Sequence, residues 1–164
     1  MPGLVLSFNR NIVCACMEEY SIRELRREDL TRDYFLLLSE LTTAPFPEEA
    51  LLFERYEFMQ RHKETYLVLV IVDTANRIVG SGTLVTEYKF LRNLGSVGHI
   101  EDIVVSKQQR GAGLGKKLIF ALLKASQEKG AYKTILATSP ENAPFYEKCG
   151  LVKKEIEMAQ YHSE

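Results

Sequence analysis

The sequence predicts an α/β fold, in which one mixed sheet carries helices on both of its faces. The length of 164 residues suits a single domain. Apolar runs typical of strands alternate with segments of helical periodicity, in the order β-α-α-β-β-β-α-β-α-β. Antiparallel strands are therefore expected in the first half of the chain, and a β-α-β-α-β arrangement in the second.

The composition narrows the class of protein. A net charge of −1 gives no reason to expect a nucleic-acid or membrane partner, and the hydrophobic content of 46% is ordinary for a globular domain. The cysteines are Cys14, Cys16 and Cys149. Their odd number and spacing argue against a disulfide framework or a zinc site. We therefore expect no metal and a reducing compartment, with the cytoplasm as the default.

The first half of the chain contains a strand, two helices and a hairpin by its residue pattern. Residues 1–16 are expected to form an N-terminal extension and residues 17–164 the single domain. The two helices are separated by a break that contains Pro45 and Pro47. The predicted elements are a strand at 20–25, helices at 30–41 and 47–62, and strands at 65–72 and 77–90.

The second half alternates strands with helices after a loop at 91–98. A helix that begins at Leu114 places Leu118, Ile119 and Leu122 on one face. It ends before Gly130, a residue typical of the C-terminal cap. The other predicted elements are strands at 99–106, 134–137 and 151–161 and a helix at 140–148.

A glycine-rich stretch, Arg110-Gly111-Ala112-Gly113-Leu114-Gly115, joins an apolar run to this helix. Exposed backbone N–H groups and the positive end of the helix dipole favour an anion such as phosphate or pyrophosphate. A P-loop is excluded because Lys117 stands where Ser or Thr is needed. A dinucleotide fingerprint is excluded because Lys116 replaces its third glycine. The alternative is a helix start that needs glycine only for close packing.

The spacing of Arg110, Gly113 and Gly115 resembles the pyrophosphate loop of the GCN5-related N-acetyltransferases (GNAT), which bind acetyl-coenzyme A. Asn142-x-x-x-Tyr146-x-x-x-Gly150 is similar to the closing segment of that family. Further strings resemble the eukaryotic glucosamine-6-phosphate N-acetyltransferases within it. They are Leu-Thr-Thr at 41–43, Gly-His-Ile-Glu-Asp-Ile at 98–103, Ala-Tyr-Lys at 131–133 and Phe-Tyr-Glu-Lys-Cys-Gly at 145–150.

The resemblance implies a GNAT fold with about six or seven strands, splayed to leave a V-shaped cleft for acetyl-CoA. It implies acetyl transfer from acetyl-CoA to glucosamine 6-phosphate, a step toward UDP-N-acetylglucosamine. It also implies a homodimer whose sugar site is shared between the chains. Two alternatives are another acetyltransferase of the same superfamily, acting on a small amine or a protein, and a non-catalytic CoA-binding module.

The residues expected to bind the cofactor lie in the glycine-rich stretch, the preceding strand and the last helix. Backbone N–H groups of the glycine-rich stretch would bind the pyrophosphate. A bulge at Glu101-Asp102 would free an N–H group for the thioester oxygen. The predicted set is Glu101, Asp102, Ile103, Arg110, Gly111, Ala112, Gly113, Leu114, Gly115, Lys116, Asn142 and Tyr146.

Tyr146 is the best candidate for a catalytic side chain, because its hydroxyl could protonate the departing sulfur. Glu101 and Asp102 are the other catalytic candidates. Family members carry an acidic residue where this sequence has Ala137, so no side-chain base is available there. A backbone carbonyl near Ala137, Glu101 acting through water, and solvent remain as alternative proton acceptors.

The resemblance also implies the residues that line the sugar site. Lys89, Arg92 and Lys133 suit a phosphate, although the family has His at the Arg92 position. Glu101 and Asp102 suit sugar hydroxyls or the amine. The predicted set is Thr42, Lys89, Phe90, Leu91, Arg92, Glu101, Asp102, Tyr132, Lys133 and Glu157.

Overall fold

The computed structural model describes residues 19–162, so the predicted extension at 1–16 lies outside the described residues. The strands are β1 (Tyr20–Glu24), β2 (Tyr66–Asp73), β3 (Ile78–Tyr88), β4 (Ser96–Val105) and β5 (Ala131–Ile135). The α-helices are α1 (Arg32–Leu38), α2 (Glu49–Arg61), α3 (Leu91–Leu94), α4 (Leu114–Glu128) and α5 (Ala143–Glu147). Two short 3₁₀ turns are η1 (Arg27–Asp29) and η2 (Lys107–Gln109).

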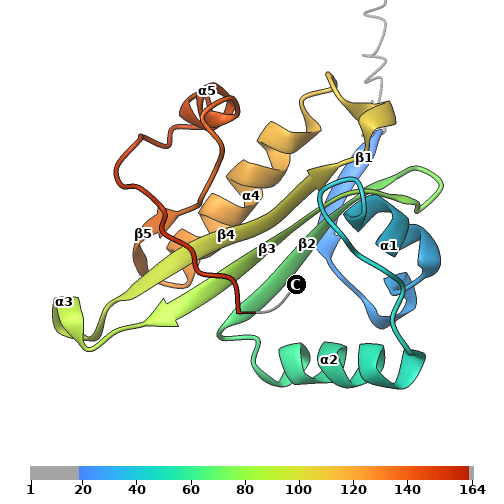
Figure 1. Cartoon of the computed structure of the whole chain (residues 1–164), viewed down its shortest axis with the longest axis horizontal. Coiled ribbons are helices and arrows are strands. Elements are labelled where there is room, and N and C mark those ends of the chain that lie inside the picture. The colour runs from blue at the N-terminus through green and yellow to red at the C-terminus, as the bar shows by residue number, and fades with distance from the viewer. Residues whose placement is uncertain (1–18, 163–164) are drawn as a thin grey trace, which may run out of the picture.

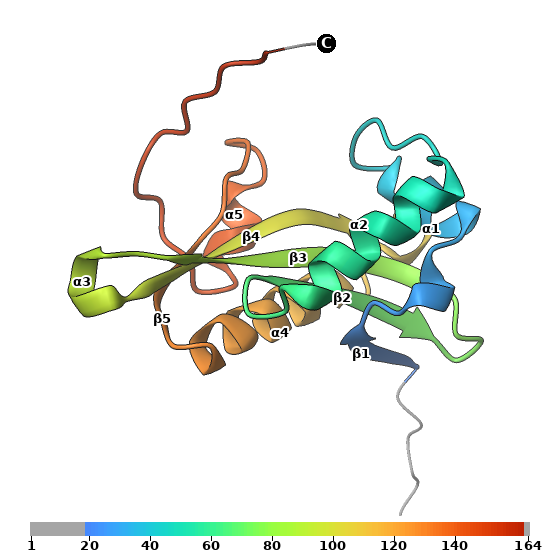
Figure 2. The same cartoon turned by 90° about the horizontal axis from the view of Figure 1, so that it is seen from below.

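The five strands form one sheet in the order β1-β2-β3-β4-β5. The first four pair as antiparallel neighbours, and β5 joins parallel to β4. Figure 2 shows α4 on one face of the sheet and α1 on the opposite face. The predicted mixed α/β architecture, with helices on both faces, is therefore confirmed.

The core consists of two apolar layers, one on each side of the sheet. On one side, the predicted face of α4 packs against β2, β3 and β4, and Leu118, Ile119 and Leu122 are fully buried. On the other side, Tyr34 of α1 packs against Val70 and Val72 of β2. Because β2 is buried on both faces, its sequence is a continuous apolar run.

The prediction of a strand at 151–161, and with it the expected six or seven strands, is wrong for the described residues. The part of the chain from Leu151 to His162 forms no helix or strand. Figure 2 shows this segment running away from the sheet toward the C-terminus. Its alternating residues fit a strand, but a strand also needs a neighbouring backbone for hydrogen bonding, and none lies beside it.

Several boundaries also differ from the prediction. The strand expected at 134–137 is β5 at Ala131–Ile135, so Tyr132 and Lys133 lie in the sheet. The loop expected at 91–98 contains α3 and the first residues of β4. The last helix covers only Ala143–Glu147. The limits of β5 follow from its pairing with β4, rather than from local periodicity.

Candidate functional site

The strands β4 and β5 separate beside the predicted cofactor site. They pair only from Ser96↔Ala131 to His99↔Ile135, whereas β4 continues to Val105. Beyond Ile135 the chain turns toward α5, and Figure 1 shows α5 next to the beginning of α4. The edge of β4 after His99 thus has no strand partner on this side within residues 19–162. This is the splayed arrangement that the sequence predicted.

The glycine-rich stretch lies between η2 and α4, at one end of this open edge. Gly111 and Gly113 have φ angles of +90° and +74°, in the left-handed region that favours glycine. Gly113 is the N-cap residue of α4, and no side chain caps the first turn. Gly115 lies against α5, where an added Cβ would approach the Phe145 ring to 3.2 Å. The free N–H groups of the first turn can therefore bind an anion.

A β-bulge interrupts β4 at the predicted position. Ser81 is opposite Val104 and Thr83 is opposite Glu101, so Gly82 alone faces two residues of β4. One of these is Asp102, whose φ angle is +54°. Gly82 permits the bulge, because a Cβ there would lie 2.4 Å from Cδ1 of Ile103. The bulge breaks the hydrogen-bonding ladder between β3 and β4 at Asp102 and Ile103.

The acidic residues Glu101 and Asp102 lie next to each other at this bulge. Desolvation raises the pKa of the Glu101 carboxyl above its ordinary value, and the negative charge of Asp102 adds to that rise. His99 opposes the rise in the pKa of Glu101, while Glu157 of the C-terminal segment adds to it. Glu101 and Asp102, two of the predicted sugar-site residues, are therefore neighbours at the bulge, and the charge of Glu157 reaches Glu101.

Tyr146 lies on α5, packed against the α4 side of the core. Burial raises the pKa of its phenol above the ordinary value of about 10. The hydroxyl is therefore protonated at neutral pH and can act as a proton donor. Asn142 is the N-cap residue of the same helix, and its side chain makes no capping bond, so its amide is available to a ligand.

Thr42 and Asp102 line one cavity of about 310 Å³ between the sheet and the helices α1 and α2. The polar side chains Tyr34, Ser81 and Thr83 line the same cavity, which is otherwise largely apolar. The sequence analysis did not select these three residues. Tyr34 belongs to the apolar stripe of a predicted helix, and the signal that could have singled it out is its hydroxyl within that stripe.

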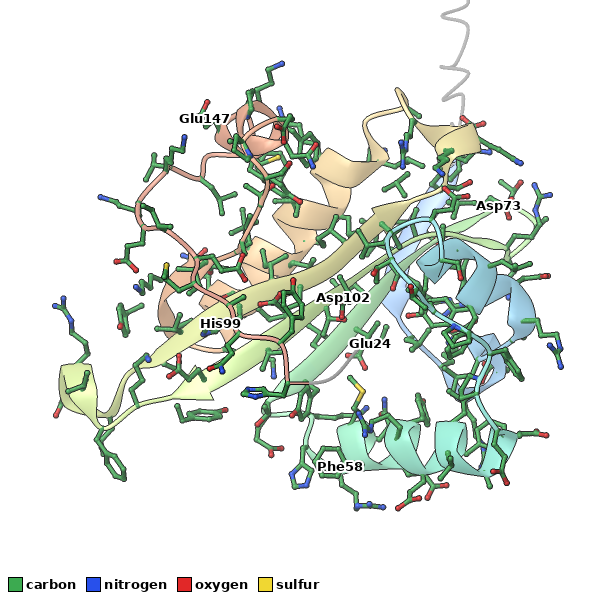
Figure 3. All side chains as sticks on the ribbon, viewed as in Figure 1. Glu24, Phe58, Asp73, His99, Asp102 and Glu147 are labelled. Carbon is green, nitrogen blue, oxygen red and sulfur yellow. The ribbon has the colours of Figure 1, made fainter. Side chains whose placement is uncertain are left out.

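The predicted phosphate-binding residues lie further along the sheet. Lys89 forms an ion pair with Glu87, whose other carboxylate oxygen lies 3.0 Å from Nε2 of His99. The guanidinium of Arg92 lies over the ring of Tyr132, 5.6 Å from its centroid. Figure 3 shows His99 and Asp102 along β4. Sequence analysis missed Glu87 and His99 as neighbours of Lys89, because their proximity depends on strand register.

Within one chain, Phe90 and Leu91 do not lie near Glu101 and Asp102. They are 95% and 72% exposed. Figure 1 shows α3 at the far end of the β3–β4 hairpin, away from α1 and α2. Lys133 lies on β5 at the edge of the sheet. A sugar site that includes all the predicted residues is therefore not complete in the single chain.

Comparison with known proteins agrees with this arrangement. Residues 21–151 match the family described as Acetyltransferase (GNAT) family. The chain is 38% identical to "Glucosamine 6-phosphate N-acetyltransferase 1" of Oryza sativa subsp. japonica, over 88% of each protein. It is 40% identical to "Glucosamine 6-phosphate N-acetyltransferase 1" of Dictyostelium discoideum, over 86% of this chain and 90% of that protein.

The fold is also similar to a solved structure, the crystal structure of glucosamine-6-phosphate N-acetyltransferase from Arabidopsis thaliana. The TM-score is 0.85 at 37% sequence identity, and the match covers 89% of this chain and all of the other. In residues 19–162, no helix has the length and apolar character that crossing a bilayer requires.

Proposed function

Since this chain belongs to the acetyltransferase (GNAT) family, we propose that it transfers the acetyl group of acetyl-CoA to the amine of glucosamine 6-phosphate. The products are N-acetylglucosamine 6-phosphate and CoA, in the biosynthesis of UDP-N-acetylglucosamine. The observation that carries this proposal is the identity of 37–40%, over 86–89% of this chain, to proteins named for that reaction.

Acetyl-CoA lies, in this proposal, along the open edge of β4 and across the start of α4. The backbone N–H groups from Arg110 to Lys116 bind the pyrophosphate, supported by the left-handed glycines and the uncapped first turn. The strand edge at Glu101–Ile103 pairs with the pantetheine amides, much as a neighbouring strand would. Asn142 hydrogen-bonds the cofactor through its free side chain.

The acetyl group is transferred when the sugar nitrogen attacks the thioester carbon and the carbon–sulfur bond breaks. A backbone N–H group freed by the bulge at Asp102 donates to the oxyanion. Tyr146 donates its proton to the departing thiolate, and the high pKa of its phenol ensures that the proton is present. The amine loses its proton to Glu101 through water, to a backbone carbonyl near Ala137, or to solvent.

We also propose that two copies of the chain share the sugar site. The most exposed large apolar side chains include Phe90, Leu91 and Leu94 at the hairpin end, and Ile156, Met158 and Tyr161 in the C-terminal segment. Exposed apolar groups that cluster in this way are typical of a protein–protein interface. A second copy that covers them could complete the sugar site at Glu101 and Asp102 of the first copy. The residues it would bring there are Lys89, Phe90, Leu91, Arg92, Tyr132 and Lys133. The cytoplasm is the compartment we propose, from the cysteine pattern.

One observation favours a second candidate, a non-catalytic CoA-binding module. Ala137 offers no side-chain base where an acidic residue is typical of the family. The protonated Tyr146 counts against that candidate, because a proton donor for the departing thiolate is needed only for turnover. The intact glycine-rich stretch fits either candidate, since both bind CoA.

The experiment that tests the function measures release of the CoA thiol from acetyl-CoA. Glucosamine 6-phosphate and unphosphorylated glucosamine are the acceptors, with the wild type and Tyr146→Phe. Turnover that requires the phosphate, together with a large fall in kcat for the variant, supports the proposal. Tight acetyl-CoA binding without turnover of either sugar would favour the module, and turnover of other amines would favour a different acetyltransferase.

A further inference from the structure

Two hydroxyl groups meet under the bulge in β4, on the α1 side of the sheet. The Tyr34 hydroxyl of α1 lies 3.0 Å from Oγ of Ser81 on β3. Both residues are buried, with 7% and 2% of their surface exposed. Ser81 is the residue of β3 immediately before the bulge. The pair therefore links the first helix to the irregular part of the proposed active site.

The pair has one proton more than its own hydrogen bond uses. Each hydroxyl carries one proton, so one is shared between the two oxygens and the other is free to donate elsewhere. A buried donor that finds no acceptor costs free energy. Both side chains line the 310 Å³ cavity, and Asp102 is another of its lining residues. An ionised carboxylate only accepts hydrogen bonds, so it is the natural partner for the second proton.

Two further observations connect Tyr34 with Asp102. Burial raises the pKa of the Tyr34 phenol; the hydrogen bond to Ser81 opposes that rise, and the negative charge of Asp102 adds to it. Tyr34 and Asp102 line the same cavity, so the carboxylate affects how readily the phenol ionises. Figure 3 shows Asp102 on the part of β4 beside α1. The phenol remains protonated, so it can serve as a donor.

Asp102 needs an external restraint if it is to orient a substrate. Its left-handed backbone conformation is unfavourable for a residue other than glycine and is typical of functional sites. Among residues 19–162, no side chain donates a hydrogen bond to the carboxylate of Asp102. The hydroxyl pair lines the same cavity as Asp102 and can supply that donor.

We propose that Tyr34 is a positioning residue, which acts through Ser81 to hold the Asp102 carboxylate toward the acceptor sugar. This inference rests on the proposed function and adds a specific role for the α1 side of the cavity. The pair donates its second proton to one carboxylate oxygen, and the other oxygen accepts from the amine or a hydroxyl of glucosamine 6-phosphate. Acetyl-CoA binds on the open edge of β4 and does not depend on this contact.

The test uses Tyr34→Phe, which removes only the hydroxyl, and Ser81→Ala, which removes its partner. For both variants we expect the KM for glucosamine 6-phosphate to rise about tenfold or more, as is typical when a charged group loses a hydrogen bond. The KM for acetyl-CoA is expected to remain within about twofold, because that site keeps its contacts. Ser81→Thr keeps a hydroxyl and should restore most of the affinity for the sugar phosphate.

A double-mutant cycle separates positioning from a general loss of packing. In an Asp102→Asn background, Tyr34→Phe should add little further loss, because the acceptor of its hydrogen bond is already changed. Tyr56→Phe is the matched control, since Tyr56 lines the same cavity from α2 and should leave both KM values unchanged. Thermal unfolding of each variant verifies that it is folded.

The results of these measurements either support or overturn the positioning role of Tyr34. An unchanged KM for the sugar phosphate in folded Tyr34→Phe and Ser81→Ala would overturn the inference, while wild-type turnover would leave the proposed function intact. An equal loss in the Asp102→Asn background, or an equal rise in both KM values, would also overturn it and assign Tyr34 a structural role. Absence of turnover in the wild type would reject the proposed function, and the inference with it.

Discussion

Replacement of Gly113 by alanine tests whether the glycine-rich stretch binds the pyrophosphate of acetyl-CoA. Gly113 has a φ angle of +74°, and a Cβ built on it would have no protein atom within 4 Å. The substitution therefore creates no clash inside the protein. It adds only the cost of a left-handed alanine, about 1 kcal/mol, and a methyl group on the surface that we propose binds the pyrophosphate.

Gly130 provides a matched control at the other end of α4. Its φ angle is +79°, and an added Cβ there also has nothing within 4 Å. Gly130→Ala should therefore destabilise the protein by a similar 1 kcal/mol or so, which lowers Tm by about 2–4 °C for a chain of this size. It lies beyond the last residue of α4, far from the proposed cofactor site.

The assay compares the KM for acetyl-CoA and the unfolding temperature of the two variants. We expect similar changes in Tm but a rise in KM of about tenfold or more for Gly113→Ala alone, as expected when a charged ligand loses one hydrogen bond. An equal KM in both variants would refute the reasoning. In that case the glycines would serve the path of the chain and not the binding of the anion.

Three further predictions concern other parts of the fold. Gly82→Ala should lower both Tm and kcat, because the new Cβ would lie 2.4 Å from Cδ1 of Ile103 and must displace the bulge; calorimetry and steady-state kinetics measure the two effects. Asp29→Asn should destabilise the protein by about 3 kcal/mol at pH 7, because Asp29 is buried in an ion pair with Arg23. Burial alone would raise the pKa of Asp29, but the hydrogen bonds and charge of Arg23, with the backbone of Arg26, lower it overall. The stabilisation is therefore present above the unfolded pKa of about 4 and is lost as the pH falls through the lower folded value, so denaturant unfolding should show the gap between wild type and variant closing in acid. Phe90→Asp should shift sedimentation from dimer toward monomer, because it places a charge on the exposed hairpin end; a wild type that is already monomeric would contradict the proposed interface.

The C-terminal segment and the cavity under the bulge show where sequence analysis reached its limit. The alternation at 151–161 is a property of the segment itself, whereas strand formation depends on a neighbouring backbone. The pair of Tyr34 and Ser81 joins residues 47 positions apart, and no local pattern connects them. The proximity of Glu101 to Glu157 likewise depends on the path of the chain after α5.

The features that the sequence alone determined are those with a local physical cause. The apolar face of α4 follows from helical periodicity, the buried strand β2 from its unbroken apolar run, and the left-handed turn before α4 from the glycines at 111 and 113. The tertiary structure alone decided how many strands pair and which side chains surround Asp102. These depend on register and on contacts between distant segments, because hydrogen bonds and packing across the sheet select one alignment among several that the local sequence permits.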